Sequence, residues 1–222
     1  MNNKVDFVPL DYRAPTEEEL LNRSQAFLKM MKKRRTVREF STRPVPDEVI
    51  INCIEAAGTA PSGAHMQPWH FVVVKDPVIK RQIREAAEKE EKTNYEMRYS
   101  AEMKMDIARL ETRFEKPYLE EAPVLIVVFK ESYRIDENQV RRKNYYVNES
   151  VGIATGLLIT ALHYSGLVAL PHTPSPMKFL NGILKRPSNE VPTVLFPVGF
   201  PDDDITVPDL KRKPLESITT VF

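Results

Sequence analysis

A run of basic residues directly after a predicted helix is the first candidate for chemistry in this sequence. Lys33-Arg34-Arg35-Thr36-Val37-Arg38 brings three guanidinium groups and a hydroxyl close together. Guanidinium groups bind phosphate oxygens in pairs, so this run could hold a phosphate group. The same run could equally be the solvated basic end of the helix. Since seven glycines form neither GxGxxG nor a P-loop, arginine side chains would have to hold any phosphate-bearing cofactor.

Two loops beside predicted strands are candidates for contacts with a planar ligand. The first, Ala60–Trp69, is rich in small residues that let backbone N–H groups approach a ligand closely. The second, Pro171-His172-Thr173-Pro174, follows a predicted strand, and loops at strand ends often carry ligand contacts. Both could also be plain connecting turns.

A charged helical segment could bind a free amino acid. Glu91 and Tyr95 are four residues apart, which places them on one face of a helix. Together with Lys116 further along, they offer a carboxylate, a phenol and an ammonium group. Such a set suits a zwitterion. The alternative is a solvated helix with surface ion pairs.

Composition excludes several other classes of function. With 42% hydrophobic residues, 28% charged residues and a net charge of +1, the chain is an ordinary globular protein, too balanced in charge to bind nucleic acid. The four histidines lack metal-ligand spacing, and GxSxG is absent, so we expect no metal and no serine nucleophile. The single Cys53 fits a reducing compartment, although export is also compatible with it. No apolar run approaches the ~20 residues that span a membrane, so we expect a soluble, cytoplasmic protein.

Hydrophobic periodicity predicts the elements that position these candidates. We expect one α+β domain over residues 1–222, with a sheet between helices, an N-terminal arm at 1–14 and a C-terminal arm at 201–222. A capping box, Thr16 with Glu19, starts the first helix. The predicted helices are 16–33, 46–58, one from 76, a polar stretch at 96–115, a core helix at 142–165 and a short one at about 177–184. The predicted strands are 69–74, 123–129, 167–170 and 191–198.

In combination, these motifs resemble a known family. Arg34–Arg38, Thr59–His65 and Pro68–Val74 resemble the flavin-binding opening of the nitroreductase superfamily. The trio of Glu91, Tyr95 and Lys116, with the stretches Pro197–Pro201 and Val207–Leu215, resembles the iodotyrosine deiodinases in particular. The trio is the more specific signal, because the opening motifs mark only the superfamily.

The resemblance implies a fold, a cofactor and an activity. The fold would be an α+β sandwich with a central mixed, mostly antiparallel sheet flanked by helices, forming a homodimer with extended terminal arms. Two FMN sites would lie at the subunit interface, with Pro61 and Ser62 reaching the flavin of the partner. The activity would be reductive dehalogenation of halotyrosines. The implied FMN-binding residues are Arg34, Arg35, Thr36, Val37, Arg38, Pro61, Ser62, Pro171, His172, Thr173 and Arg212.

The resemblance also implies roles around the substrate. Glu91 would pair with the substrate ammonium, Lys116 with its carboxylate, and Tyr95 would add a hydrogen bond. The backbone N–H of Ala64 would face the phenolate. Thr173 would be catalytic, its hydroxyl bonding to flavin N5. Membrane-bound members carry an N-terminal anchor, and this sequence shows none, which again predicts a soluble protein.

Three alternatives stay open at this point. A general NAD(P)H-dependent FMN nitroreductase would share the fold and flavin site, and only the trio argues against it. A non-catalytic protein that binds flavin or halotyrosine would show the same motifs. The basic run could also bind an anionic partner with no flavin present. No motif identifies the electron donor, for which NAD(P)H acting through a reductase is one option.

Overall fold

The structure is a computed structural model in which residues 5–222 are described. The chain divides into two compact units, one ending at Arg34 and the other spanning Arg35–Phe222. The first unit contains α1 (Glu17–Lys32), which begins at the predicted capping box: Glu19 N donates to Thr16 Oγ1 (3.2 Å), and Thr16 N donates to Glu19 Oε2 (2.8 Å). Residues 5–14 of the predicted arm form neither helix nor strand, and residues 1–4 lie outside the described residues. The assignment of one domain to the whole chain stays a prediction.

The second unit is built on a four-stranded sheet in the order β1 (Trp69–Val74), β2 (Val124–Glu131), β6 (Glu190–Gly199) and β5 (Val168–Ala169). All three strand pairs are antiparallel. A parallel bridge between Thr36 and Ala169 of β5 adds the segment around Thr36 to this sheet. The sheet is therefore mixed and mostly antiparallel, as predicted.

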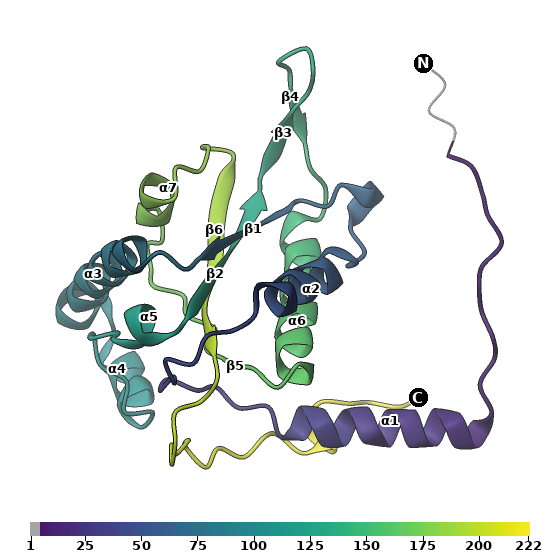
Figure 1. Ribbon diagram of the computed structural model, residues 1–222, viewed down its shortest axis with the longest axis horizontal. Coiled ribbons are helices and arrows are strands. Elements are labelled where there is room, and N and C mark those ends of the chain that lie inside the picture. The colour runs from purple at the N-terminus through teal and green to yellow at the C-terminus, as the bar shows by residue number, and fades with distance from the viewer. Residues whose placement is uncertain (1–4) are drawn as a thin grey trace. The chain divides into compact units, whose positions relative to one another are not determined.

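Helices cover both faces of the sheet because β2 is apolar on both faces. Val124, Ile126 and Val128 point to one face and join a core formed with α2 (Asp47–Gly58) and α6 (Val147–Tyr164). The alternate residues point to the other face and join a core formed with α3 (Pro77–Thr93), α5 (Tyr118–Glu121) and α7 (Phe179–Ile183). Figure 1 shows these two helical layers on opposite sides of the strands. The predicted α+β sandwich is confirmed.

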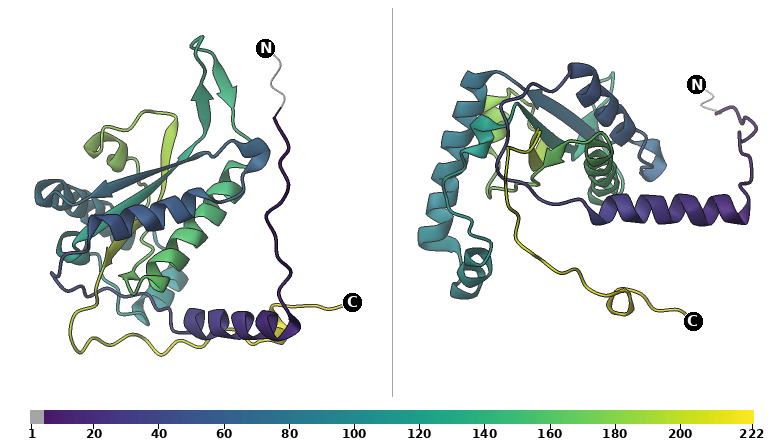
Figure 2. Two further views of the ribbon diagram at one scale, coloured as in Figure 1. Left: turned by 45° about the vertical axis from the view of Figure 1, so that its right-hand side comes forward. Right: turned by 60° about the horizontal axis from the view of Figure 1, so that its bottom comes forward.

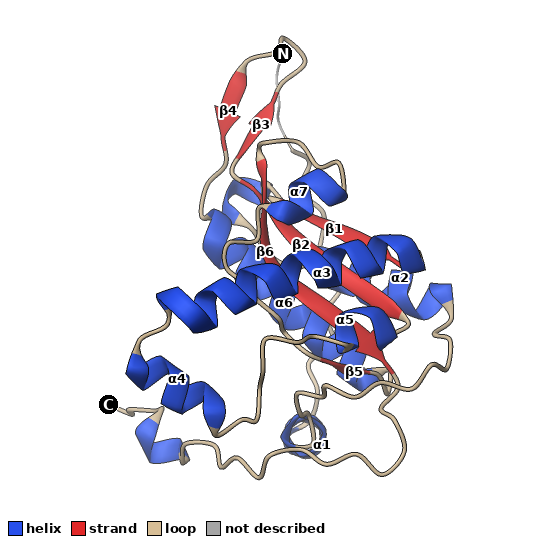
Figure 3. Ribbon diagram, turned by 90° about the vertical axis from the view of Figure 1, so that its left-hand side faces the viewer, coloured by secondary structure: helices blue, strands red, loops and turns tan. Residues whose placement is uncertain are grey.

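The predicted helix over 142–165 is wrong at its start. Residues 142–143 belong instead to a hairpin of β3 (Tyr133–Ile135) and β4 (Arg141–Lys143), which extends beyond the end of the sheet (Figures 2 and 3). Its arginine-rich strands lack the β-branched pattern that identified the others. α6 starts only at Val147, after Tyr146 in a left-handed conformation (φ 47°).

α6 is also less buried than its sequence predicts. It buries one face, but Ile153 is 46% exposed and Leu157 36% exposed in the single chain. A Cβ atom added at Gly152 or Gly156 would meet nothing within 4 Å. A helix that is apolar nearly all round therefore presents an uncovered face. Among the described residues, no helix has the length and apolar character needed to cross a membrane.

The polar stretch after α3 is only partly helical. α3 continues into a π-helical turn, η2 (Asn94–Arg98), and α4 (Ala101–Ala108) follows. Near the start of α3, Lys80 is buried, and its ammonium group donates to the main-chain carbonyls of Glu120 (2.7 Å) and Ala122 (2.8 Å) at the end of α5. These bonds join α3 to the segment that leads into β2.

This anchor predicts a stability effect. Lys80→Met should lower the free energy of unfolding by about 1–3 kcal/mol, because two carbonyls lose their donor. Denaturant unfolding measures the change. Lys89→Met, at an exposed position on the same helix, is the matched control and should behave as wild type. Equal unfolding midpoints for Lys80→Met and Lys89→Met would contradict the role of this anchor.

Candidate active site

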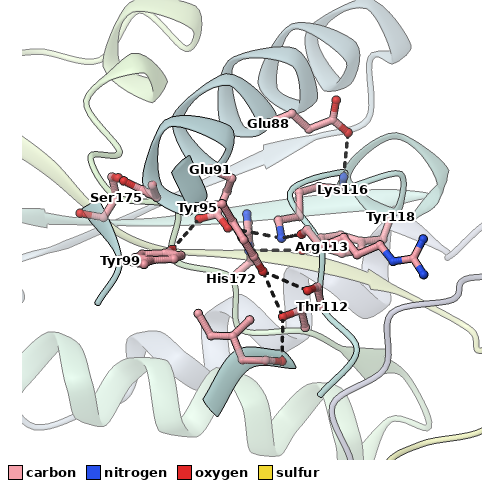
Figure 4. A network of polar contacts seen from close by, with 12 residues as sticks. Glu88, Glu91, Tyr95, Tyr99, Thr112, Arg113, Lys116, Tyr118, His172 and Ser175 are labelled. Carbon is pink, nitrogen blue, oxygen red and sulfur yellow. Dashed lines mark hydrogen bonds and ion pairs between the residues drawn. The ribbon is translucent and has the colours of Figure 1, made fainter. Parts of the chain in front are cut away.

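A buried ion pair joins the end of α3 to the segment before α5. Lys116 Nζ lies 3.3 Å from Glu91 Oε2, with side chains only 5% and 9% exposed. The same ammonium group also donates to the carbonyl of Arg113. The Lys116 main chain is fixed too, since its N–H donates to Glu88 Oε1 (2.7 Å). Burial lowers the pKa of Lys116, and repulsion from Arg38 adds to this, while Glu91 opposes it. Figure 4 shows these groups converging.

Two tyrosines from the π-helical region line the same place. The Tyr95 ring lies 5.9 Å from Lys116 Nζ, and its hydroxyl donates to the carbonyl of Thr112 (3.0 Å). Tyr99, at the end of η2, donates its hydroxyl to Glu91 Oε1 (3.4 Å), and its ring packs 5.3 Å from that of Tyr95. Burial raises the pKa of Tyr99, and the negative charge of Glu91 adds to the shift. The phenol therefore stays protonated and able to donate to the carboxylate.

A second aromatic pair lies deeper, where the loop after β5 meets α5. Tyr118 and His172 are both buried, with the Tyr118 hydroxyl 3.4 Å from His172 Nδ1. Burial raises the pKa of Tyr118 and lowers that of His172 to about 3. The other ring nitrogen, His172 Nε2, is buried and has no hydrogen-bond partner among the described residues. Buried polar atoms are nearly always paired, so this nitrogen suits a ligand atom.

Two cavities share Arg38 and Glu111 in their walls. The larger, of about 620 Å³, is lined by Thr36 and Arg38 of the basic run and by tail residues 206–210. The smaller, of about 480 Å³, is lined by Arg38, residues 111–113, Glu115, Lys116, Pro117 and Tyr118. The basic run and the Glu91–Lys116 pair, far apart in sequence, therefore border adjoining spaces.

The other residues of the basic run lie in different environments. The Arg35 guanidinium donates to the carbonyl of Pro208, which holds the tail against the run. Val37 is buried in the core. Arg34 ends the first unit, where its N–H donates to Met31 O (3.2 Å). Arg212 lies in the exposed tail. The phosphate contacts predicted for Arg34 and Arg212 remain predictions.

The loop after α2 has an unusual backbone. Ala64, His65 and Gln67 all have positive φ values of 49–54°, a conformation costly for residues with side chains. The Ser62 hydroxyl supports the loop by accepting from Gln67 N (2.9 Å). A Cβ atom at Gly63 would lie 2.6 Å from the ring of Tyr146, so glycine is required there. Strain of this kind is often retained where backbone groups must face a ligand.

This loop and the ion pair lie on different sides of the sheet. Residues 61–67 adjoin the start of α6, through the contact of Gly63 with Tyr146. Glu91 of the ion pair is in α3, which lies across the sheet from α2 and α6 in Figure 1. One chain therefore brings together Glu91, Tyr95, Lys116, Arg38 and the 171–175 loop. It does not bring Pro61, Ser62 and Ala64 to them.

A further cluster lies at the start of β6. His70, Glu131 and Glu190 place their ligand atoms within 4.8 Å of one another. The spacing along the chain gave no sign of this, since three different strands supply the residues. Arg186 already binds both carboxylate oxygens of Glu190 (2.7 and 2.5 Å), which accounts for part of the cluster as an ion pair. The expectation of no metal stays a prediction.

Sequence reasoning missed several residues of the site. Tyr99 stands eight residues after Glu91, a spacing that keeps it near the same helical face and could have identified it. Tyr118 and the buried Asn94 gave no such signal. Both depend on tertiary contacts that one sequence does not reveal.

The buried, neutral His172 predicts a pH-dependent stability. Its folded-state pKa of about 3 lies below its ordinary value of 6.5. Between these values the unfolded chain binds a proton that the folded chain does not, so stability is present above the unfolded pKa and is lost as pH falls below it. On going from about pH 7 to about pH 5.5, wild type should lose about 1 kcal/mol more than His172→Gln. Urea unfolding of the cofactor-free protein measures this difference. His65→Gln, at an exposed histidine, should retain the wild-type dependence, and identical losses in all three proteins would contradict the prediction.

Known proteins resemble this chain over most of its length. Residues 31–200 match the nitroreductase family. An iodotyrosine deiodinase of Haliscomenobacter hydrossis is 52% identical over 222 residues, which cover 100% of both chains. Human iodotyrosine deiodinase 1 is 45% identical over 217 residues, 96% of this chain and 74% of that protein.

Solved structures of flavoproteins also resemble this chain. Oxidised iodotyrosine deiodinase bound to FMN and 3-iodo-L-tyrosine has a TM-score of 0.74 at 34% identity, over 85% of this chain and 97% of that one. A BluB-like flavoprotein from Clostridium difficile 630 shares the fold, with a TM-score of 0.67 at 24% identity over 88% of this chain and 98% of that one. The chain belongs to the nitroreductase family and, within it, to the iodotyrosine deiodinases.

Proposed function

We propose that this protein is an FMN-dependent oxidoreductase that removes halide reductively from halotyrosines. The observation that carries the proposal is the buried Glu91–Lys116 pair beside Tyr95, next to a cavity that Arg38 also lines. The relatives named iodotyrosine deiodinase that match nearly the whole chain support the same activity.

The ion pair explains why the substrate should be a zwitterion. Glu91 and Lys116 neutralise each other, and removing either partner would leave a buried charge uncompensated. An amino acid can replace the pair, because its ammonium group satisfies Glu91 while its carboxylate satisfies Lys116. Tyr95 is close enough to add a hydrogen bond. A ligand with a single charge would leave one side chain unpaired and should bind poorly.

The residues of the second unit fit FMN in type and position. Arg35, Thr36 and Arg38 would hold its phosphate, since Thr36 and Arg38 line the larger cavity. Pro171, His172 and Thr173 would line the flavin edge, where the unpartnered His172 Nε2 can meet a ligand atom. When bound, FMN in its reduced form supplies the two electrons that, with one proton, convert the carbon–halogen bond to carbon–hydrogen and release halide.

The residues of the chain would contribute binding, orientation and exclusion of water. Thr173 is exposed, and its hydroxyl, which would donate to flavin N5, is the proposed catalytic group. The N–H of Ala64, in the strained loop, would stabilise the substrate phenolate. A halogen beside the hydroxyl lowers the phenol pKa, so a site built for phenolate favours halotyrosine over tyrosine. The segment from Glu91 to Lys116 would cover the substrate and keep water from the flavin.

The separation of the 61–67 loop from the Glu91–Lys116 pair supports a homodimer. A second copy would bring Pro61, Ser62 and Ala64 to the flavin and cover the outer face of α6. That face carries the exposed Ile153 and Leu157 beside glycines with open space around them. Small residues beside apolar ones permit close packing of helices. The electron donor is not identified, with NAD(P)H acting through a reductase as one option, and the cytoplasmic location stays a prediction.

Reductive release of halide tests the activity. FMN-loaded protein reduced anaerobically with dithionite should convert diiodotyrosine to tyrosine and iodide, catalytically and above a flavin-only control. Glu91→Gln should lower kcat/KM about a hundredfold, because the substrate ammonium loses its counter-charge and Lys116 is left unpaired. Glu85→Gln, at an exposed position on the same helix, is the matched control and should retain wild-type activity.

Two outcomes would reject the assignment. If FMN binds but halide stays at the control level, the protein is no dehalogenase, and turnover of nitroaromatics with NAD(P)H would identify a general nitroreductase. If Glu91→Gln and Glu85→Gln are equally active, Glu91 does not bind the substrate.

The dimer has its own test. Replacing Ile153 and Leu157 together by lysine should abolish the dimer, because buried, unpaired charges would face each other across the interface. Analytical ultracentrifugation measures the mass, and FMN content should fall with it if the site is shared. Val78→Lys alters an exposed apolar residue on α3 and should leave the mass unchanged. A monomeric wild type would contradict the proposal.

A further inference from the structure

We propose that Asn94 is a positioning residue that couples the substrate-binding end of α3 to the loop bearing Thr173. The inference rests on the proposed function and deepens it. It assigns to one buried side chain the task of aligning Thr173 when substrate is bound.

Asn94 bridges two segments that are far apart in the sequence. It is 2% exposed, and its Nδ2 donates to the carbonyl of Ser175 at 2.7 Å. Its Oδ1 accepts from Arg98 Nη1 (3.1 Å), and the same guanidinium reaches Glu90 (3.1 Å). Donor and acceptor are both used, so the carboxamide is held in one orientation. Figure 4 shows Ser175 on the side of the site where Glu91 and Tyr99 meet.

The loop that Asn94 reaches is fixed at its other end by the sheet. His172 N donates to Leu195 O (2.8 Å), and Leu195 N donates to His172 O (2.9 Å). Thr173 is exposed between these two anchors, one on β6 and one on the end of α3. With His172 immobile, the position of Ser175 decides where the Thr173 hydroxyl lies.

The Asn94 anchor sits within the substrate-binding segment itself. Asn94 is between Glu91 and Tyr95, and its carbonyl accepts from Tyr99 N (2.8 Å), closing the π-helical turn. Single π-turns recur at functional sites. A substrate that separates Glu91 from Lys116 must shift this turn. Because the carboxamide cannot rotate without losing a partner, Ser175 follows, and Thr173 moves relative to the flavin. Binding of the substrate between Glu91 and Lys116 is thereby linked to the alignment of Thr173 with the flavin.

Variants of the FMN-loaded enzyme test the coupling. Asn94→Asp keeps the shape and the acceptor for Arg98 but loses the donor to Ser175, and Asn94→Ala removes both contacts. The matched control is Asn144→Ala. Asn144 is also a buried asparagine (4% exposed) that donates to a main-chain carbonyl, that of Glu131 (2.9 Å), outside the site. Thr173→Ala, and Thr173→Ser with its hydroxyl retained, calibrate the loss of the catalytic group.

Three measurements are compared with and without 3-iodotyrosine: its affinity by flavin fluorescence, kcat for iodide release, and hydrogen exchange of segments 88–99 and 171–176. In wild type and Asn144→Ala, substrate should protect both segments. Asn94→Asp should retain affinity within about threefold and protection of 88–99. It should lose protection of 171–176, and its kcat should fall about tenfold, toward that of Thr173→Ala.

The results distinguish failure of the Asn94 coupling from failure of the dehalogenase assignment. If Asn94→Asp and Asn94→Ala keep wild-type kcat and protection of 171–176, the coupling is wrong while the dehalogenase assignment stands. If wild type releases no iodide, the assignment fails and the coupling with it. Should the Asn94 variants fold poorly, wild type alone still decides: exchange in 171–176 that does not respond to iodotyrosine, while 88–99 does, overturns the inference.

Discussion

The buried pair of Glu91 and Lys116 is the constraint on which the site depends. Two opposite charges out of water must stay together or be replaced by two others, because a single buried charge is costly. The two charges can stay together only if the end of α3 lies against the segment before α5. In the proposed function the pair would also select the ligand, since only a molecule with both charges at a suitable separation could enter without leaving an unpaired group. Tyr99, which donates to Glu91, keeps the carboxylate oriented.

The sheet imposes a second constraint, on where the parts of the site can come from. β2 is buried on both faces, so helices cover both, and the two helical layers are separated by the sheet. The strained 61–67 loop lies on the α6 side, and the ion pair lies on the α3 side. The proposed homodimer would bring the two together in one site. The uncovered face of α6 offers the surface for it.

The sequence predicts a helix, strand or site residue well when the residues that determine it are close together in the chain. The β-branched runs of β1, β2 and β6 and the capping box of α1 were correctly predicted from short patterns. The β3–β4 hairpin was missed because its strands are arginine-rich and solvated rather than alternating. Glu91 and Tyr95 were found from helical spacing, although α3 gives way to a π-turn between them. Asn94 looks like any polar residue of a charged helix until the loop at Ser175 is placed against it.

The residues that form the fold differ from those proposed to give substrate specificity. The same fold occurs in a protein with only 24% identity, so this architecture tolerates wide divergence in sequence. In the proposed function, the groups that select the substrate lie outside the sheet, in the irregular stretch from Glu91 to Tyr118 and in the loop from Pro171 to Ser175. These two segments meet at Asn94. An irregular segment can move when a charged ligand replaces an internal ion pair, whereas β2 cannot. In the proposed function, the rigid sheet would therefore hold the flavin edge through His172, while the polar segment would both recognise the substrate and align Thr173.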